Sequence, residues 1–251
     1  MSEDELADTN APLLDHLIEL RRRLLWSLVA LGACFLVCLY FARPIFAVLV
    51  QPLVAAGQNR LIYTQIFEAF FTELRVAFFA GAMLAFPIIA NQLWQFVSPG
   101  LYRREKRALL PFLWATPILF TAGAALAYFV AIPLALRYLL GFEGSLGGVR
   151  QEAMPAVGNY LSFVMQFLFG FGIAFLMPVL LMVLEQAGVV TRDQLVKGRR
   201  YAIVVAAGLA AVLTPPDIGS MMLLFVPLVI LYELTLVVTR FTGRRRQLDA
   251  A

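Results

Sequence analysis

Two glutamates beside clusters of arginine are the residues of this sequence best suited to bind a cationic ligand. Glu19 has Arg22 and Arg23 three and four residues further on, so on a helix it can pair with either of them. Glu105 is the only acid in the stretch 98–107, and on a helix none of the residues three or four positions away can pair with it. Because the surrounding cations keep its carboxylate ionised, we expect Glu105 to be available to a cation from outside the chain.

Each of these glutamates also has a simpler interpretation. Glu19 can form an ordinary ion pair on a solvated helix face, and Glu105 can be a solvated acid that moderates a basic loop. The residues three and four positions from Glu105 are Leu101, Tyr102, Ala108 and Leu109.

Two further polar residues lie within long apolar runs. An ionisable side chain inside a membrane is costly and usually functional, which makes Glu233 a candidate site. Glu233 is only about two helical turns from Arg240, so an ion pair at the membrane interface is an equal alternative. For Gln166 a hydrogen bond between helices is the simpler interpretation.

Patterns typical of an enzyme or of a cofactor site are missing from the sequence. It has no G-x-x-x-x-G-K-[ST] loop for phosphate, no H-E-x-x-H pair for zinc, and His16 is its one histidine. Cys34 and Cys38 both fall within an apolar run, where small apolar residues explain them better than a disulfide or a metal. We therefore expect no enzymatic activity, no cofactor and no metal.

The composition indicates a membrane protein. Hydrophobic residues make up 61% of the chain and charged residues 14%, against about 25% charged in soluble domains. The net charge of +4 does not indicate nucleic-acid binding, because the cations flank apolar runs without interleaved aromatics. Six apolar runs predict an all-α, polytopic protein with six transmembrane helices, at residues 24–41, 73–97, 109–136, 160–184, 201–213 and 218–238.

Two features predict an uneven bundle. The fifth run has 13 residues, about 20 Å of helix, whereas the hydrocarbon core is about 30 Å thick. Prolines inside the spans favour kinks and hence a bent, concave wall of helices, although proline is also simply common in membrane helices. These prolines are Pro87, Pro111, Pro117, Pro133, Pro178 and Pro227.

The cations predict the orientation of the chain. Of the 20 lysines and arginines, 15 fall in four clusters with two apolar runs between successive clusters. Because cations beside spans are retained in the cytoplasm, we expect both termini to be cytoplasmic. The predicted organisation is a cytoplasmic tail with an amphipathic helix (1–23, the helix at 12–20), a six-helix membrane domain (24–239) and a basic cytoplasmic tail (240–251). The outside segments 43–67 and 137–159 should lie along the interface as short caps.

Four motifs resemble those of a known family in order and spacing. They are HLIELRRRLL at 16–25, QFVSPGLYRRE at 95–105, NYLSFV at 159–164 and LTPPD at 213–217. Together they resemble the TatC family, the multispanning receptor subunit of the twin-arginine protein translocase. The resemblance implies a protein of the bacterial cytoplasmic membrane that binds twin-arginine signal peptides and helps to export folded proteins with the proton-motive force. Its implied partners are single-span TatA-type and TatB-type subunits, other copies of itself and the lipid bilayer.

The resemblance also implies roles for particular residues. The signal-binding carboxylates correspond to Glu19 and Glu105, and a guanidinium suits a carboxylate bidentately, which is a reason for arginine over lysine in the signal. Phe96 matches an aromatic that supports recognition, and Tyr102 belongs to the same loop motif. Other matched positions tied to activity are Arg21 and Leu24 near the signal site, and Pro52, Thr214 and Asp217 elsewhere.

The sequence departs from the family pattern inside the membrane. Leu176 stands where many relatives have a glutamate, and Met221 stands where a glutamine is common. We expect Gln166 and Glu233 to supply the polar contacts that these two residues cannot make. The alternative function is a small-solute transporter or channel, but such a protein should line a midplane cavity with several polar groups, and this chain has few.

Overall fold

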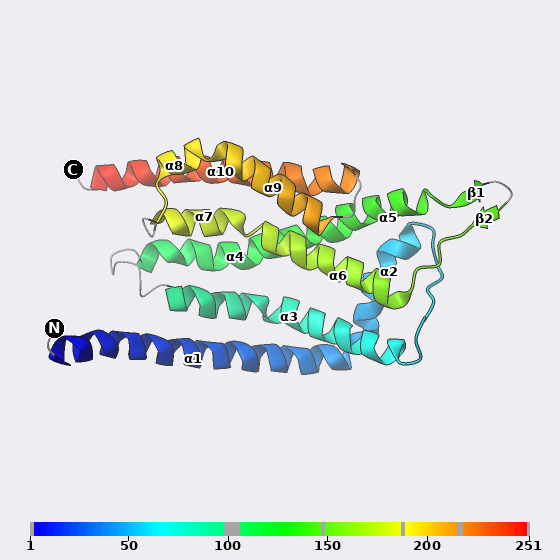
Figure 1. Ribbon diagram of the computed structural model, residues 1–251, viewed down its shortest axis with the longest axis horizontal. Helices are drawn as coiled ribbons and strands as arrows, with labels where there is room; N and C mark the ends of the chain where they lie inside the picture. The colour runs from blue at the N-terminus through cyan, green and yellow to red at the C-terminus, as the bar shows by residue number, and fades with distance from the viewer. Residues whose placement is uncertain (1–2, 98–105, 147–148, 187–188, 215–217, 250–251) are drawn as a thin grey trace.

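The computed structural model describes residues 3–97, 106–146, 149–186, 189–214 and 218–249 (Figure 1). Nearly all of the described chain is helical, which confirms the all-α fold class. The elements are α1 (Glu3–Tyr40), α2 (Ala42–Ala55), α3 (Glu68–Val97), α4 (Lys106–Leu126), a π-helical segment (Ala127–Ala131), α5 (Ile132–Leu140), β1 (Gly144–Leu146), β2 (Val149–Gln151), α6 (Val157–Ala174), α7 (Met177–Gln186), α8 (Arg192–Lys197), α9 (Arg199–Leu213) and α10 (Ile218–Asp249).

Five helical segments of the described chain are long and apolar enough to cross a membrane. They are Leu17–Tyr40, Glu68–Phe96, Trp114–Leu140, Val157–Glu185 and Ile218–Thr239. The remaining predicted span forms α9, whose 15 residues give about 22 Å of helix. This length is well below the ~30 Å of a hydrocarbon core, so the expected sixth span is a short helix.

Two of the spans are interrupted where proline removes a backbone donor. In the third span the π-helical segment lies just before Pro133, and in the fourth Phe175 and Leu176 separate α6 from α7, whose second residue is Pro178. By contrast, Pro87 and Pro227 lie inside the continuous helices α3 and α10.

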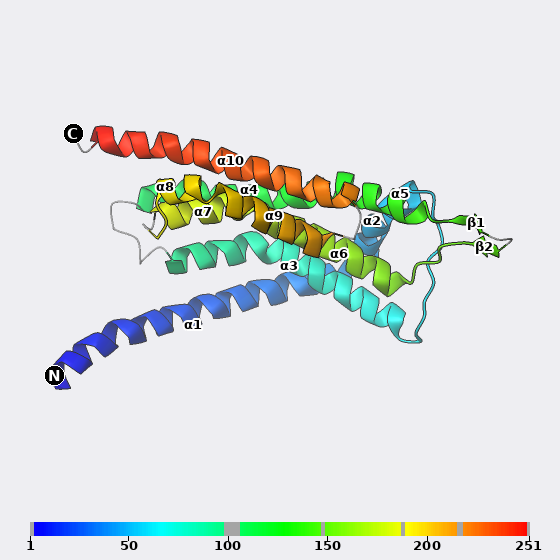
Figure 2. The same ribbon diagram turned by 45° about the horizontal axis from the view of Figure 1, so that its top comes forward.

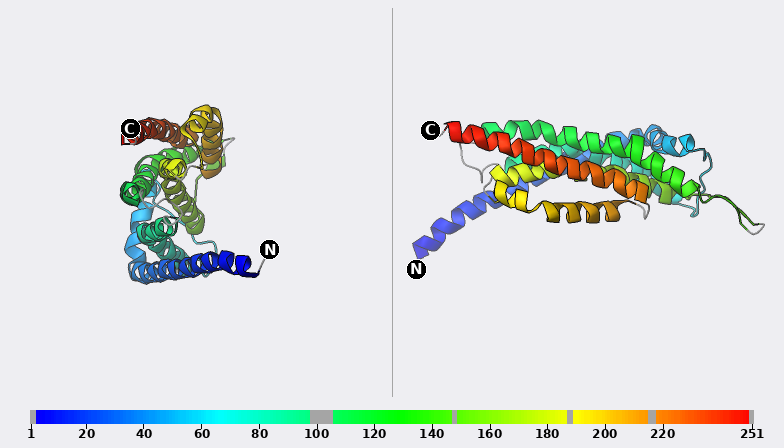
Figure 3. Two further views of the ribbon diagram at one scale, coloured as in Figure 1. Left: turned by 90° about the vertical axis from the view of Figure 1, so that its left-hand side faces the viewer. Right: turned by 90° about the horizontal axis from the view of Figure 1, so that it is seen from above.

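The first helix differs from the sequence expectation. Residues 12–20 were expected to form a separate amphipathic helix, but they belong to α1, which runs unbroken from Glu3 to Tyr40. The physical reason is local, because residues 13–31 contain neither proline nor glycine to end a helix. In Figures 2 and 3 the first part of α1 diverges from the other helices. Residues 240–249, expected as a tail, likewise continue α10.

The helices form a curved stack with α1 on one side and α9 and α10 on the other (Figure 3). α1 packs against α3, and α3 packs against α4 and α6. α6 contacts α9, and both α7 and α9 contact α10. The core is centred on α6, where Val164, Phe167 and Phe171 are fully buried. Small residues allow the closest approach, because a Cβ atom on Gly123 would lie 2.5 Å from the carbonyl oxygen of Phe171.

The two ends of the bundle are different. α1 begins and α10 ends at the same end, which we call the termini end (Figure 1). The other end carries β1 and β2, which pair antiparallel, and we call it the hairpin end. There the backbone of Ile62 pairs with Ala156, and the Glu68 carboxylate accepts a hydrogen bond of 2.8 Å from the amide of Gly158. The starts of α3 and α6 are thereby joined.

α2 lies across the hairpin end and is fixed there by two tyrosines (Figure 1). Pro52 lies inside α2 and has no N–H, so the Val48 carbonyl four residues earlier loses its helical donor. The hydroxyl of Tyr128 donates to this carbonyl oxygen at 2.7 Å, and the hydroxyl of Tyr160 donates to that of Leu49 at 2.9 Å. Pro52 therefore creates the acceptor that binds α2 to the third span.

This arrangement predicts a stability effect that depends on Pro52. Tyr128→Phe should lower the free energy of unfolding by about 1 kcal/mol, or the melting temperature by about 2–4 °C, because the Val48 carbonyl loses its donor. In a Pro52→Ala background the alanine N–H can bond that carbonyl, so the same change should cost less. Thermal unfolding of the single and double variants in detergent measures the difference. Tyr138→Phe is the control, since the Tyr138 hydroxyl makes no hydrogen bond to the described residues, and additive effects of Tyr128→Phe and Pro52→Ala would contradict the assignment.

Candidate functional site

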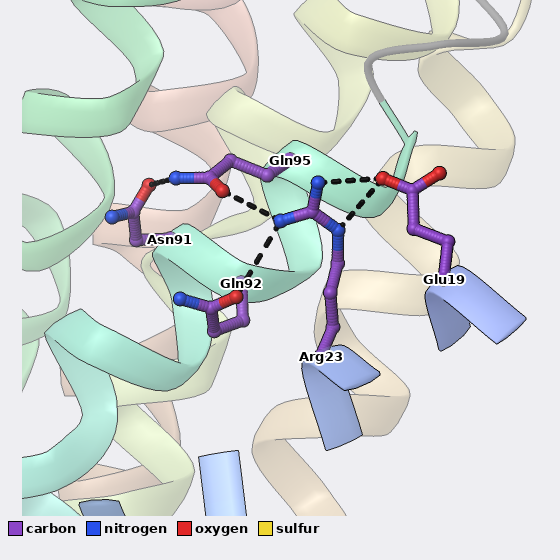
Figure 4. Close-up of polar contacts among 5 residues, drawn as sticks. All are labelled: Glu19, Arg23, Asn91, Gln92 and Gln95. Atoms are coloured by element: carbon purple, nitrogen blue, oxygen red, sulfur yellow. Dashed lines mark hydrogen bonds and ion pairs between the residues drawn. The ribbon is translucent and has the colours of Figure 1, made fainter. Parts of the chain in front are cut away.

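A polar network joins α1 to α3 at the termini end (Figure 4). One carboxylate oxygen of Glu19, Oε1, accepts hydrogen bonds from Arg23 Nε at 3.0 Å and Nη2 at 2.6 Å. Nη1 of Arg23 donates to Gln95 Oε1 at 2.5 Å and, more weakly, to Gln92 Oε1 at 3.5 Å. The Gln95 amide in turn donates to Asn91 Oδ1 at 3.1 Å. The guanidinium of Arg23 thus connects a carboxylate on one span to amides on the next.

This network forms one wall of a pocket of about 480 Å³. The lining residues of α1 recur at helical spacing, and those of α3 are one turn apart. Ile18 and Trp26 add apolar surface beside the charged groups. The pocket is lined by Ile18, Glu19, Arg22, Arg23, Trp26, Gln92 and Gln95.

Only one of the two carboxylate oxygens of Glu19 is used by Arg23. Arg23 occupies Oε1, whereas Oε2 makes no hydrogen bond to any residue that the structure describes. The side chains of Glu19 and Arg23 are 32% and 21% exposed, so the pair is partly screened from water. A charge-assisted hydrogen bond is stronger in such a place than on an open surface. Oε2 is therefore the acceptor that Arg23 leaves open in this pocket, which is also lined by a second cation, Arg22.

The structure places the other predicted signal-site residues around this pocket or outside the described chain. Phe96 is half-buried on the last turn of α3, next to Gln95. Arg21 and Leu24 are exposed on α1 but do not line the pocket. Glu105 and Tyr102 lie outside the described residues.

The residues predicted for partner contacts do not form a single cluster in the described chain. Pro52 is buried in α2 at the hairpin end, and Thr214 ends α9 with its hydroxyl donating to the Ala210 carbonyl at 2.7 Å. Asp217 lies outside the described residues. Glu233 on α10 forms an ion pair, the second of the two alternatives, but its partner is Arg199 of α9 at 3.1 Å and not the Arg240 from which the pair was argued. Gln166 on α6 instead lines an apolar groove that faces α1 and α3.

Sequence reasoning missed three amides and one tryptophan of the site. Asn91, Gln92 and Gln95 lie in an otherwise apolar stretch of α3, and their spacing of three and four residues places them on one helix face. This polar stripe was a usable signal. Trp26 follows Glu19 by seven residues on α1 and could have been assigned to the same face.

The described residues contain no group of three or more histidines, cysteines, aspartates or glutamates that could hold a metal ion. Cys34 and Cys38 are free thiols in α1.

The fold and the site together define a multispanning membrane protein with a polar pocket at one end of the bundle. The family model for the Sec-independent protein translocase protein TatC matches residues 15–227. The chain is 44% identical to TatC of Magnetococcus marinus over 241 residues, which are 95% of this chain and 88% of that protein. It is 38% identical to TatC of Aquifex aeolicus, covering 94% of this chain and 98% of that one. A crystal structure of a twin-arginine translocase receptor, TatC, superposes with a TM-score of 0.76 at 38% identity, covering 89% of this chain and 98% of that chain.

The chain therefore belongs to the TatC family. It is a multi-pass protein of the bacterial inner membrane, and it is a component of the twin-arginine protein translocase rather than an enzyme.

Proposed function

We propose that this protein is the receptor of the translocase and binds the arginine pair of a signal peptide in the pocket between α1 and α3. The observation that carries the proposal is Oε2 of Glu19, which makes no hydrogen bond to the described residues and lies in a partly screened polar pocket. An incoming guanidinium can bind this oxygen while Arg23 keeps Oε1 and holds the carboxylate in place. Glu105, from the QFVSPGLYRRE motif at 95–105, is proposed as the second counter-charge.

The pocket also supports the choice of arginine over lysine. A guanidinium has five donors in a plane and can bind the Glu19 carboxylate and a glutamine amide together, as Arg23 already does with Glu19 and Gln95. The compact ammonium of lysine reaches fewer of these acceptors. Ile18 and Trp26 offer apolar contact to the residues that follow the arginine pair. Binding of a twin-arginine peptide, compared with its twin-lysine variant, tests this proposal.

We further propose that both termini are cytoplasmic, so that the pocket faces the compartment in which signal peptides are made. This orientation rests on the cation clusters, because α9, whose first residues are Arg199 and Arg200, starts at the termini end (Figure 1). Arg43, outside the clusters, belongs to α2 at the hairpin end.

After binding, the receptor is proposed to nucleate a complex with TatA-type and TatB-type subunits and other copies of itself. This complex is proposed to export folded proteins with the proton-motive force. The short helix α9 and its neighbour α10 form the proposed docking wall. A short helix is mismatched with the thickness of the bilayer, and a partner's single span beside it lowers the free-energy cost of this mismatch. Exposed apolar side chains of α9 support this, with Val204 69% and Val212 74% exposed. We propose that Thr214, Asp217, Glu233, Gln166 and Pro52 affect recruitment rather than signal binding.

The docking wall predicts where crosslinks should form. Val205 and Met222 are 56% and 46% exposed on α9 and α10, so cysteines at these positions should crosslink to cysteines in a TatA-type or TatB-type span in native membranes. Val29, which is 61% exposed on α1 at the opposite side of the stack, is the control position and should react little. Equal crosslinking at all three positions, or at Val29 alone, would contradict the wall.

A further inference from the structure

An apolar groove of about 640 Å³ opens between α1, α3 and α6, away from the signal-peptide pocket. Its walls are largely aromatic, with Phe35 from α1, Phe78 from α3 and Phe169 from α6. Phe78 and Phe169 are 56% and 40% exposed. Two polar residues, Arg75 and Gln166, line the same groove.

The guanidinium of Arg75 has no anionic partner within the described chain. The glutamates near it are engaged elsewhere: Glu73 pairs with Arg43 at 3.3 Å, and the Glu68 carboxylate accepts hydrogen bonds from Gly158 and Thr64. A cation beside an apolar groove in a membrane is costly unless it meets an anion or reaches the interface. Arg75 therefore needs either an anion from outside the described residues or access to the membrane interface.

The depth of Arg75 in the bundle indicates which anion is available. α3 has 30 residues and is about 45 Å long, so about 7 Å of it extends beyond a ~30 Å hydrocarbon core at each end if the helix is centred. Arg75 is seven residues, or about 10 Å, from Glu68. Its Cα atom then lies about 3 Å inside the core, and its side chain can extend to the level of the lipid phosphates.

Gln166 lies at a similar depth. The contact between Glu68 and Gly158 fixes the starts of α3 and α6 at one level, and Gln166 is eight residues, or about 12 Å, beyond Gly158. The amide of Gln166 is thus slightly deeper than Arg75. In a phospholipid the ester carbonyls are likewise slightly deeper than the phosphate.

We propose that this groove is a binding site for an anionic phospholipid of the leaflet at the hairpin end. Arg75 pairs with the phosphate, Gln166 donates to an ester carbonyl, and one acyl chain lies against Phe35, Phe78 and Phe169. A guanidinium can bind a phosphate through two parallel hydrogen bonds. The preference for an anionic lipid comes from net charge, because the choline ammonium of phosphatidylcholine balances its phosphate and is repelled by the guanidinium. A purely apolar partner helix fits the site less well, because it would leave the Arg75 guanidinium and the Gln166 amide without polar partners.

The test is native mass spectrometry of the full-length protein in detergent, with phosphatidylglycerol and phosphatidylcholine added at equal concentration. The wild type should retain phosphatidylglycerol in preference to phosphatidylcholine. Arg75→Gln should reduce the retained phosphatidylglycerol about five-fold and remove the preference, whereas Arg75→Lys should keep part of it. Arg43→Gln is the matched control, since Arg43 is already paired with Glu73, and it should leave retention unchanged.

A second variant tests the acyl-chain part of the site without changing a charge. Ala82 lines the groove, and Ala82→Phe should fill it and reduce the retention of both lipids. Equal retention of phosphatidylglycerol by the wild type and Arg75→Gln would overturn the proposal. Loss of a co-purifying single-span protein from the Arg75→Gln variant, with lipid retention unchanged, would also overturn the proposal. The groove would then be a site for a partner protein.

Discussion

Replacing Glu105 with glutamine should weaken the binding of a twin-arginine signal peptide by about 10- to 150-fold. This range corresponds to the ~1.5–3 kcal/mol of a hydrogen-bonded contact to a charged group. Glutamine keeps the size and helix preference of glutamate and removes only its charge. Glu105→Arg should weaken binding further, because repulsion is added to the lost attraction. The measurement is peptide affinity in detergent or native membranes at fixed ionic strength.

The control for this change is Glu73→Gln, which removes a glutamate at the opposite end of the bundle that is already paired with Arg43. It should leave peptide affinity unchanged. Unchanged affinity in correctly folded Glu105→Gln protein would show that recognition rests elsewhere, and the apolar surface of Phe96 and Leu24 would be the next candidate.

Reversing the charge of Glu19 should have the second large effect. Glu19→Arg would place a third cation beside Arg22 and Arg23 in the pocket, so affinity for the signal peptide should fall by about two orders of magnitude. Glu19→Gln should cost less, about 2- to 10-fold, because Arg23 already neutralises part of the carboxylate in the free receptor. Fluorescence titration with a labelled peptide gives both values.

Glu73→Arg is the matched control for the charge reversal. Glu73 also pairs with an arginine, but it lies near the start of α3, whereas Gln92 and Gln95 of the pocket lie near the end of that helix. A loss of affinity in Glu19→Gln as large as that in Glu19→Arg would contradict the role given to Arg23. It would mean that Glu19 is fully available before the peptide arrives.

Hydropathy predicted most of the fold, because membrane spans depend mainly on composition. The apolar runs at 73–97 and 160–184 appear as the spans Glu68–Phe96 and Val157–Glu185, longer by a few residues at the hairpin end. These extra turns are stabilised by contacts that a hydropathy window cannot detect, such as the Glu68 carboxylate with the amide of Gly158. The unbroken α1 was missed for another reason, since the change from polar to apolar residues at Leu24 was interpreted as a boundary although no helix breaker lies there.

The candidate site was predictable where it depends on neighbours in sequence. The pairing of Glu19 with Arg23 follows from their spacing of four residues, and the structure has it. The hydrogen bond from Arg23 to Gln95 joins residues 72 positions apart, and it exists only because α1 packs against α3. The position of Arg75 could not be predicted for the same reason. In the sequence it is only a cation outside the clusters, whereas the packing of α3 and α6 places it in a groove with Gln166.

The measurement that tests the central claim most directly compares two peptides and two receptors. Affinities of a signal peptide with an arginine pair and of its twin-lysine variant are measured for the wild type and for the Glu19→Gln/Glu105→Gln double variant at one ionic strength. If carboxylates of the receptor recognise the guanidinium pair, the wild type should prefer the twin-arginine peptide by about ten-fold or more, and the double variant should bind both peptides equally weakly. A double variant that keeps the full preference for arginine would contradict the account.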